Sequence, residues 1–365
     1  MNKKLLLFGF SILCSVHLFS QEDFTEKNEI ITDLAINDTI EKKSKMLPFL
    51  IPITEPAIGY GAIIGGLLFV PKDDPEIQSD MIVLAGGATT NSTWFTGGGY
   101  FGFWKDDTVR YVGYAGGGKV TMKFYGLSDL GYGNPFYFDQ RIFLITQQLE
   151  FRLGESNFFL GGKYQLSRVS VPHNVQTNLF FDLKDYKITN SGVSFIAEYD
   201  NLNDFLTPTN GAKVYFSYDQ NLEFLGSQRD WGMVTFYSHL YHRASDLWVP
   251  SLRLDSKFAT GNPPFYAFPY VELRGVPALR YQGRITMVAE TEHLINLTKK
   301  WGVVGFTGIG AAFKSFEEFH NEEVIWNLGF GARYRPIESM PVRLGADFAK
   351  GPEDFAFYIS IGSAW

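Results

Sequence analysis

The sequence predicts an all-β fold, a transmembrane antiparallel β-barrel of about 16 strands, and three observations support this prediction. The 365 residues include 37 glycines, 16% aromatic residues and only 19% charged residues, a composition typical of strands with tight turns and interfacial rings. From Pro48 onwards, alternating segments are separated by clusters of Gly, Pro, Asn and Asp. Beyond the first 20 residues, no apolar run reaches the roughly 18 residues of a membrane-spanning helix, so a spanning chain must form a barrel.

Residues 1–20 are predicted to be a cleavable signal peptide. Two lysines precede the apolar stretch 5–19, and Ser20 is a small residue at the expected cleavage point. The only cysteine, Cys14, lies inside this segment, so the mature chain would contain no thiol, which suits an oxidising compartment. Export of a barrel predicts the bacterial outer membrane as its location.

Residues 21–46 are predicted to form a short periplasmic tail ahead of a barrel domain at 47–365. Between positions 21 and 45 the tail carries seven acidic and four basic side chains, and it is shorter than the roughly 50 residues of a small domain. The net charge of the chain is -7, so no overall basic excess is available to neutralise a nucleic-acid backbone. We therefore expect no nucleic-acid partner.

The alternation of apolar and polar side chains defines the individual strands. The predicted strands are 47–54, 57–70, 79–90, 94–104, 108–124, 138–152, 156–170, 190–201, 211–221, 229–242, 247–261, 281–295, 301–314, 324–335, 340–350 and 354–365. Pro52 interrupts the first strand. In the last strand the odd positions, including Phe357 and Trp365, are predicted to face lipid and to close the sheet.

The lengths of the connections also favour a membrane barrel, in which short turns lie on one side and long loops on the other. Short connections alternate along the chain with long ones at 125–137, 172–189 and 262–280. A large soluble β-protein is the alternative fold. The small number of charges on the outward faces disfavours it.

A tight turn is predicted after the strand at 190–201. Asp200 and Asp204 stand at the strand end, and Pro208 and Gly211 lead into the next strand. Proline fixes φ, and glycine permits a sharp entry into the following strand. An ordinary polar turn would also account for these residues.

A short motif, Leu273-Arg274-Gly275-Val276, lies inside the long connection between the eleventh and twelfth predicted strands. Glu290 and Glu292 follow on the twelfth strand, where alternation places both on the lumen face. Asp347 falls on the lumen face of the fifteenth strand. Each carboxylate is therefore a candidate acceptor for a charge-assisted hydrogen bond from Arg274.

In this order, the turn, the arginine motif and the carboxylate strand resemble segments of the BamA/TamA superfamily of outer-membrane barrels, also called the bacterial surface antigen family. The resemblance implies an inward-folded loop between strands 11 and 12, with Arg274 meeting a wall carboxylate. Glu292 is the first choice, Glu290 the second and Asp347 the third.

Two positions depart from the pattern of that family. Val276 stands where the family prefers an aromatic residue, and Gly308 stands where it usually has an aspartate. Because Gly308 removes one expected carboxylate, we expect Arg274 to be held only weakly.

The resemblance implies a role in the insertion or translocation of protein or lipid at the outer membrane. The implied partners are outer-membrane lipid, a protein or lipid client, and periplasmic partner proteins. The tandem POTRA domains of the family are not expected, because the predicted tail is too short to hold one. The alternative is a passive pore, a structural barrel or a surface antigen without insertase activity. A weak seam between the first and last strands, favoured by Pro52, would support the first role.

No enzyme, cofactor or metal site is expected. His239 and His242 are three residues apart on a predicted strand and therefore face opposite sides, so they cannot hold one ion together. The sequence contains no nucleophile elbow, P-loop or dinucleotide fingerprint.

Overall fold

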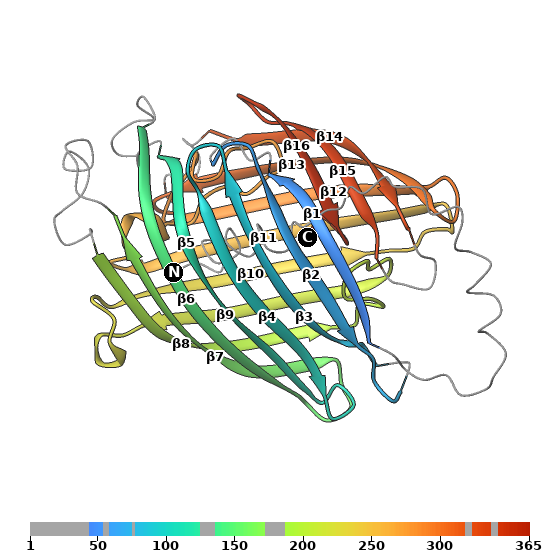
Figure 1. Ribbon diagram of the computed structural model, residues 1–365, viewed down its shortest axis with the longest axis horizontal. Coiled ribbons are helices and arrows are strands. Elements are labelled where there is room, and N and C mark those ends of the chain that lie inside the picture. Colours follow the sequence, from blue (N-terminus) through green and yellow to red (C-terminus); the bar gives the residue numbers. More distant parts are fainter. Residues whose placement is uncertain are drawn as a thin grey trace.

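The computed structural model describes residues 44–53, 58–74, 77–124, 136–171, 187–317, 323–336 and 342–365. They form one 16-stranded antiparallel sheet in which each strand pairs with its neighbours along the chain. The sheet curls into a nearly closed barrel with steeply tilted strands (Figure 1). The predicted signal peptide at 1–20 and most of the predicted tail at 21–46 lie outside the described residues.

The number of strands agrees with the prediction from alternation. The strands are β1 (Lys45–Ile53), β2 (Gly61–Val70), β3 (Asp80–Thr89), β4 (Trp94–Trp104), β5 (Val109–Phe124), β6 (Phe136–Arg152), β7 (Phe158–Ser170), β8 (Lys187–Asp200), β9 (Gly211–Asn221), β10 (Trp231–Tyr241), β11 (Trp248–Gly261), β12 (Ile285–Asn296), β13 (Trp301–Phe313), β14 (Ile325–Tyr334), β15 (Leu344–Lys350) and β16 (Phe355–Ile361). The last strand ends four residues before its predicted end at 365.

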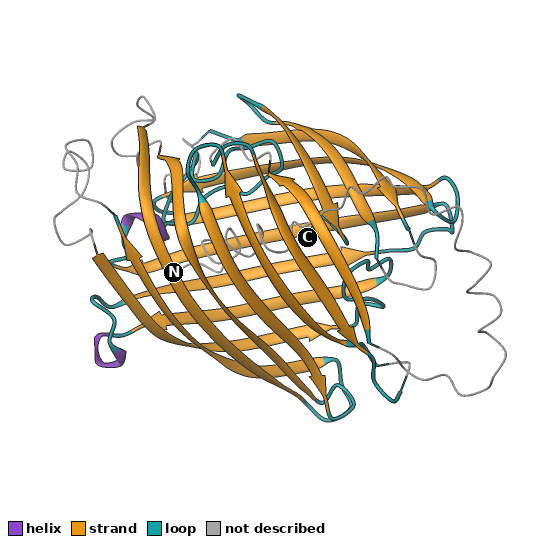
Figure 2. Cartoon of the chain, in the orientation of Figure 1, coloured by secondary structure: helices purple, strands orange, loops and turns teal. Residues whose placement is uncertain are grey.

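Helical structure is limited to two short 3-10 turns in the described part of the chain, drawn in purple in Figure 2. They are η4 (Glu223–Leu225) and η5 (Phe265–Ala267). No helix among the described residues is long and apolar enough to cross a membrane.

The two faces of the barrel wall differ in chemistry. On β13, Trp301, Val303 and Ile309 are exposed on the outside, whereas Val304 and Phe306 are buried inside. Buried charged side chains gather on the inner faces of other strands; they include Glu150, Lys163, Glu198, Asp219, Glu290 and Asp347. An apolar outer face with a polar interior is typical of a membrane barrel and unlike a soluble protein.

Proline does not interrupt the first strand, contrary to the prediction for Pro52. β1 pairs with β2 without a break, with Pro48 opposite Gly66 and Pro52 opposite Ala62. Proline fits an edge strand when the position of its missing N–H faces away from the paired neighbour. In the described part of the chain no ladder joins β1 to β16, so β1 is such an edge.

Candidate functional site

The candidate site is built on the connection between β11 and β12, which is mostly buried. Tyr266 in η5 is 1% exposed, and its hydroxyl accepts a hydrogen bond from Asn190 Nδ2 of β8 at 3.0 Å. Further along, the Val271 N–H donates to the Tyr281 carbonyl at 2.9 Å and closes the segment on itself. These contacts hold the connection against inward-facing side chains.

Arg274 contacts all three carboxylates named as candidates. Its Nη1 donates to Glu292 Oε2 at 2.7 Å and to Asp347 Oδ2 at 3.0 Å. Its Nε donates to Glu290 Oε1 at 3.1 Å. The three acidic side chains are 10% exposed or less. The guanidinium therefore links β12 to β15 through charge-assisted hydrogen bonds in a region with little solvent.

Two more arginines balance these acids, and the sequence analysis did not single them out. Arg333 of β14 forms ion pairs with Asp347 and, at 3.3 Å, with Glu292. Arg253 of β11 lies 3.6 Å from Glu290, its register partner on β12. Three carboxylates thus meet three guanidinium groups, which offsets part of the cost of burying charge.

An aromatic ring also faces Arg274, from a position that the motif did not indicate. The Arg274 Cζ atom lies 3.4 Å from the centroid of the Phe306 ring on β13. This distance is that of a cation–π contact. The aromatic contact comes from the barrel wall, while Val276 is buried in an apolar cluster with Leu273 and Val271.

Gly308 does not leave Arg274 weakly held, and the expectation to that effect is wrong. A Cβ at position 308 would lie 2.8 Å from Leu273 Cδ2 and 2.9 Å from Asn327 Oδ1. Asn327 Nδ2 instead donates to Glu290 Oε1 at 2.8 Å and to the Arg274 carbonyl at 3.0 Å. The space is filled, and Asp347 supplies the third acid from another strand.

Gly275 brings the loop backbone close to the wall. Its φ is +84°, and a Cβ there would lie 2.8 Å from the Gly351 nitrogen. Its N–H donates to the Tyr358 hydroxyl of β16 at 3.0 Å. Only glycine combines the left-handed φ with this close approach.

Trp365 lies inside the barrel, which corrects its predicted place on the lipid face. β16 ends at Ile361, and Gly362 has a φ of +89°, so the strand alternation stops there. The Trp365 indole Nε1 donates to Glu290 Oε2 at 2.9 Å, and its ring centroid lies 5.8 Å from that of Tyr241. Phe357 stays on the strand, where its ring contacts Phe348 of β15.

The turn between β8 and β9 is held by hydrogen bonds of its own side chains. Asp204 Oδ1 accepts the N–H groups of Leu206 and Thr207 at 2.9 and 2.6 Å. Gly211 has a φ of +107°, and a Cβ there would lie 2.4 Å from the Asn201 carbonyl oxygen. Pro208 lines a pocket at this end of the barrel.

Asp200 belongs to a separate ionic network on the other side of the lumen. Its Oδ2 accepts from Arg110 Nη1 of β5 at 2.7 Å and lies 3.4 Å from Lys213 Nζ. Glu198 binds the same two cations at 3.1 Å each. Asp200 therefore contacts the lumen network rather than the Arg274 group.

No protein-family model matches the sequence, and no curated protein matches it. The structure is similar to BamA from Haemophilus ducreyi lacking POTRA domains 1-3, with a TM-score of 0.57 and 15% identity over 88% of this chain and 70% of that chain. It is also similar to CdiB from Escherichia coli, with a TM-score of 0.61 and 10% identity over 87% of this chain and 62% of that chain.

For CdiB from Acinetobacter baumannii the TM-score is 0.58 and the identity 11%, over 88% of this chain and 60% of that chain. The chain therefore spans less than two thirds of either CdiB chain. At these identities the likeness concerns the fold. The chain has the barrel architecture of BamA and CdiB, as the resemblance of its motifs implied.

Proposed function

We propose that this chain resides in the bacterial outer membrane and inserts or translocates protein or lipid through an opening between β1 and β16. The observation that carries the proposal is the seam between these two strands. In the described residues β1 pairs with β2 and β16 pairs with β15, but no ladder joins β1 to β16.

The composition of β1 favours a seam that opens. Pro48 and Pro52 are four residues apart, so both occupy the same edge of the strand. Because β1 pairs with β2 along its whole length, the missing N–H donors fall on the edge toward β16. A ladder there would lack two donors and would separate more easily than its neighbours.

The wall on the β16 side of the seam is braced. We propose that the connection between β11 and β12 is the inward-folded loop implied by the family resemblance, with Arg274 as its anchor. The contacts to Glu292 and Asp347 support this, because they join the loop to β12 and β15. The Gly275 bond to Tyr358 extends the brace to β16. The barrel would then open at the seam while the braced wall keeps its shape.

The proposed partners are outer-membrane lipid, a protein or lipid client, and periplasmic partner proteins, without enzymatic chemistry. A passive pore, a structural barrel or a surface antigen would need no movement at the seam. Buried ion pairs such as Lys163 with Asp219 and Arg333 with Asp347 occupy the lumen, which favours a mobile wall over a wide central channel.

The test is to lock the seam with a disulfide. Leu50→Cys on β1 would be combined with Ile359→Cys on β16. The matched control combines Leu50→Cys with Ile64→Cys, whose positions are already register partners between β1 and β2. Purified barrel in phospholipid vesicles would receive an unfolded test barrel protein, and its insertion would be followed by protection from protease.

We expect the oxidised seam pair to abolish insertion, reductant to restore it, and the oxidised control pair to leave it unchanged. Equal insertion by both oxidised pairs would contradict the proposal. So would insertion by the unmodified barrel that is no faster than in empty vesicles. Leakage of a small dye through the locked barrel would instead support the passive pore.

A further inference from the structure

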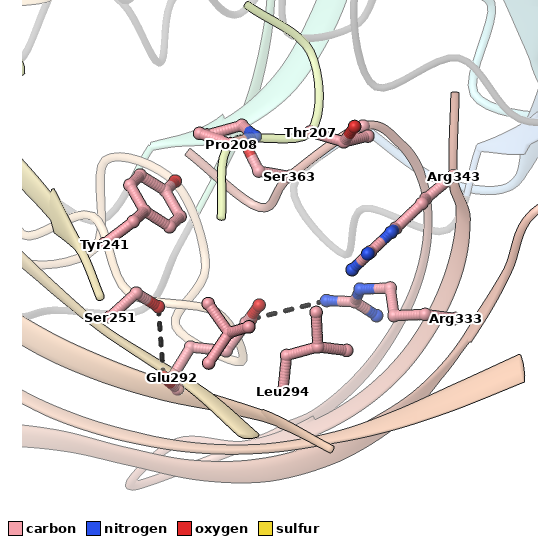
Figure 3. Close-up of a pocket in the computed structure, with 11 residues that line it drawn as sticks. Thr207, Pro208, Tyr241, Ser251, Glu292, Leu294, Arg333, Arg343 and Ser363 are labelled. Carbon is pink, nitrogen blue, oxygen red and sulfur yellow. Dashed lines mark hydrogen bonds and ion pairs between the residues drawn. The ribbon is translucent and has the colours of Figure 1, made fainter. Parts of the chain in front are cut away.

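A small pocket lies beside the Arg274 group, at the end of the barrel where the β8–β9 turn is found. Thr207 and Pro208 of that turn, Tyr241 of β10 and Ser363 after β16 line it together with Arg333 and Arg343 (Figure 3). Glu292 and Arg333 connect it to the Arg274 group, and Arg343 lies beside Arg333 (Figure 3).

Arg343 is the second arginine that lines the pocket. Its guanidinium points into the pocket toward Arg333 (Figure 3). Among the described residues no carboxylate forms an ion pair with Arg343, and Asp204, the acid nearby, accepts N–H groups of its own turn. Burial and the neighbouring Arg335, Arg333 and Arg243 lower the pKa of Arg343 to about 10. The cation is thus held among like charges without an acid of its own.

One further donor that lines the pocket is also unused. The Tyr241 hydroxyl is buried beside Ser363, whose own hydroxyl donates to the Trp365 carbonyl at 2.6 Å, and it makes no hydrogen bond of normal geometry in the described part of the chain. A buried donor without an acceptor costs free energy, so unused donors around one space indicate a missing acceptor.

We propose that this pocket binds a phosphate group through Arg343, with Tyr241 as a further donor. The two donors come from separate elements and lie on different sides of the pocket (Figure 3), which suits an anion with several oxygens. A guanidinium pairs well with phosphate, and the ligand charge would relieve the repulsion among the arginines. The group belongs either to a lipid headgroup or to free inorganic phosphate. The inference does not rest on the proposed seam.

The test uses the whole barrel in an uncharged detergent, with heat-induced unfolding followed by the change in gel migration. Inorganic phosphate would be titrated at constant ionic strength set with chloride, and sodium acetate would be the carboxylate comparison. We expect phosphate, and not acetate, to raise the unfolding midpoint. Arg343→Gln should weaken the apparent phosphate affinity at least tenfold, and Tyr241→Phe about threefold.

The control is Arg229→Gln in the β9–β10 connection, which removes one positive charge at the other end of the barrel and should keep the phosphate response. Arg343→Gln should unfold no earlier than the unmodified protein without phosphate, because Arg343 has no ion pair to lose. A folded variant therefore reports on binding itself.

The two sources of phosphate are separated by mixed micelles. Micelles with phosphatidic acid present a lipid phosphate, and micelles with phosphatidylcholine alone serve as the comparison. Stabilisation by inorganic phosphate identifies the free ion, and stabilisation only by phosphatidic acid identifies a lipid headgroup. The proposal is overturned if neither stabilises the barrel, if acetate acts as strongly as phosphate, or if Arg343→Gln responds like the unmodified protein.

Discussion

Arg274 and Arg343 lie in neighbouring parts of one lumen and meet opposite surroundings. Arg274 donates to Glu290, Glu292 and Asp347, and the Phe306 ring covers its face. Arg343 has other arginines as its main charged neighbours. Acids of the fold thus neutralise the first guanidinium, although its Nη2 atom makes no hydrogen bond among the described residues, whereas the second forms no ion pair there. A buried charge that the fold neutralises indicates a structural brace, and one that it leaves without an acid indicates a place for a ligand.

The largest effect is expected from removing Arg274, whose charge the fold neutralises. Arg274→Ala leaves three buried carboxylates with two arginines, and losing one partner of a buried ionic group costs about 3–5 kcal/mol. The contacts in the structure thus predict a strong effect of this substitution, whereas Gly308 in the sequence suggested a weak one. We expect a large drop in the denaturant midpoint of the purified barrel and faster proteolysis between residues 262 and 284.

Arg343→Gln is the matched comparison for this change, because it removes the same charge from a site without an ion pair. Its denaturant midpoint should not fall. Equal losses in the two variants would show that the two sites do not differ in the way described.

A smaller loss of stability is expected from a change at Trp365, which bonds to Glu290 in the Arg274 group. Trp365→Phe keeps an aromatic ring but removes the indole N–H that Glu290 accepts, at a cost of about 1–3 kcal/mol. Trp301→Phe, on the exposed outer face, is the control and should cost little. The measurement is the denaturant midpoint of each folded barrel. A larger drop in the denaturant midpoint of Trp301→Phe would indicate that the indole that stabilises the barrel lies at the lipid interface.

The smallest effect on stability is expected near the end of the β11–β12 connection, where Arg280 binds Glu353. Arg280 Nε donates to both Glu353 oxygens, at 2.9 and 3.0 Å, and this bond holds the pKa of Glu353 below its usual value. A lowered carboxyl pKa adds stability above the unfolded value of about 4.3, and this stability is lost as the pH falls through the folded pKa. Because Glu353 is partly exposed, solvent screening keeps the effect small.

We therefore expect hydrogen exchange at positions 277–283 to rise below about pH 4, after correction for the intrinsic rate. In Glu353→Gln, the amides at positions 277–283 should exchange rapidly already at pH 6. Their exchange should then change less when the pH is lowered. The same protection in both proteins at pH 6 would rule out a role for this bond.

Much of the barrel could be predicted from alternation alone. The period of two placed Glu290, Glu292 and Asp347 on the inner face, because that period does not depend on the curvature of the sheet. The same rule failed at Trp365, since it assumes a continuing strand and Gly362 takes a positive φ.

Other parts of the site needed the closed shape of the wall. Phe306 and Arg333 come from β13 and β14, and their contacts with the Arg274 group depend on how the barrel brings those strands toward the loop. The lack of an ion pair at Arg343, among the described residues, likewise depends on which carboxylates lie nearby. The spacing of residues along the sequence carries no such information.

The prolines of β1 have a consequence for the behaviour of the barrel in a crowded membrane. A strand without a neighbour can pair with the same strand of another copy and begin edge-to-edge aggregation. Pro48 and Pro52 remove two donors from that edge, so a second copy cannot form a complete ladder with it. The prolines that keep the seam weak thereby also limit permanent association between barrels. Contacts between two copies at an open seam would be short-lived.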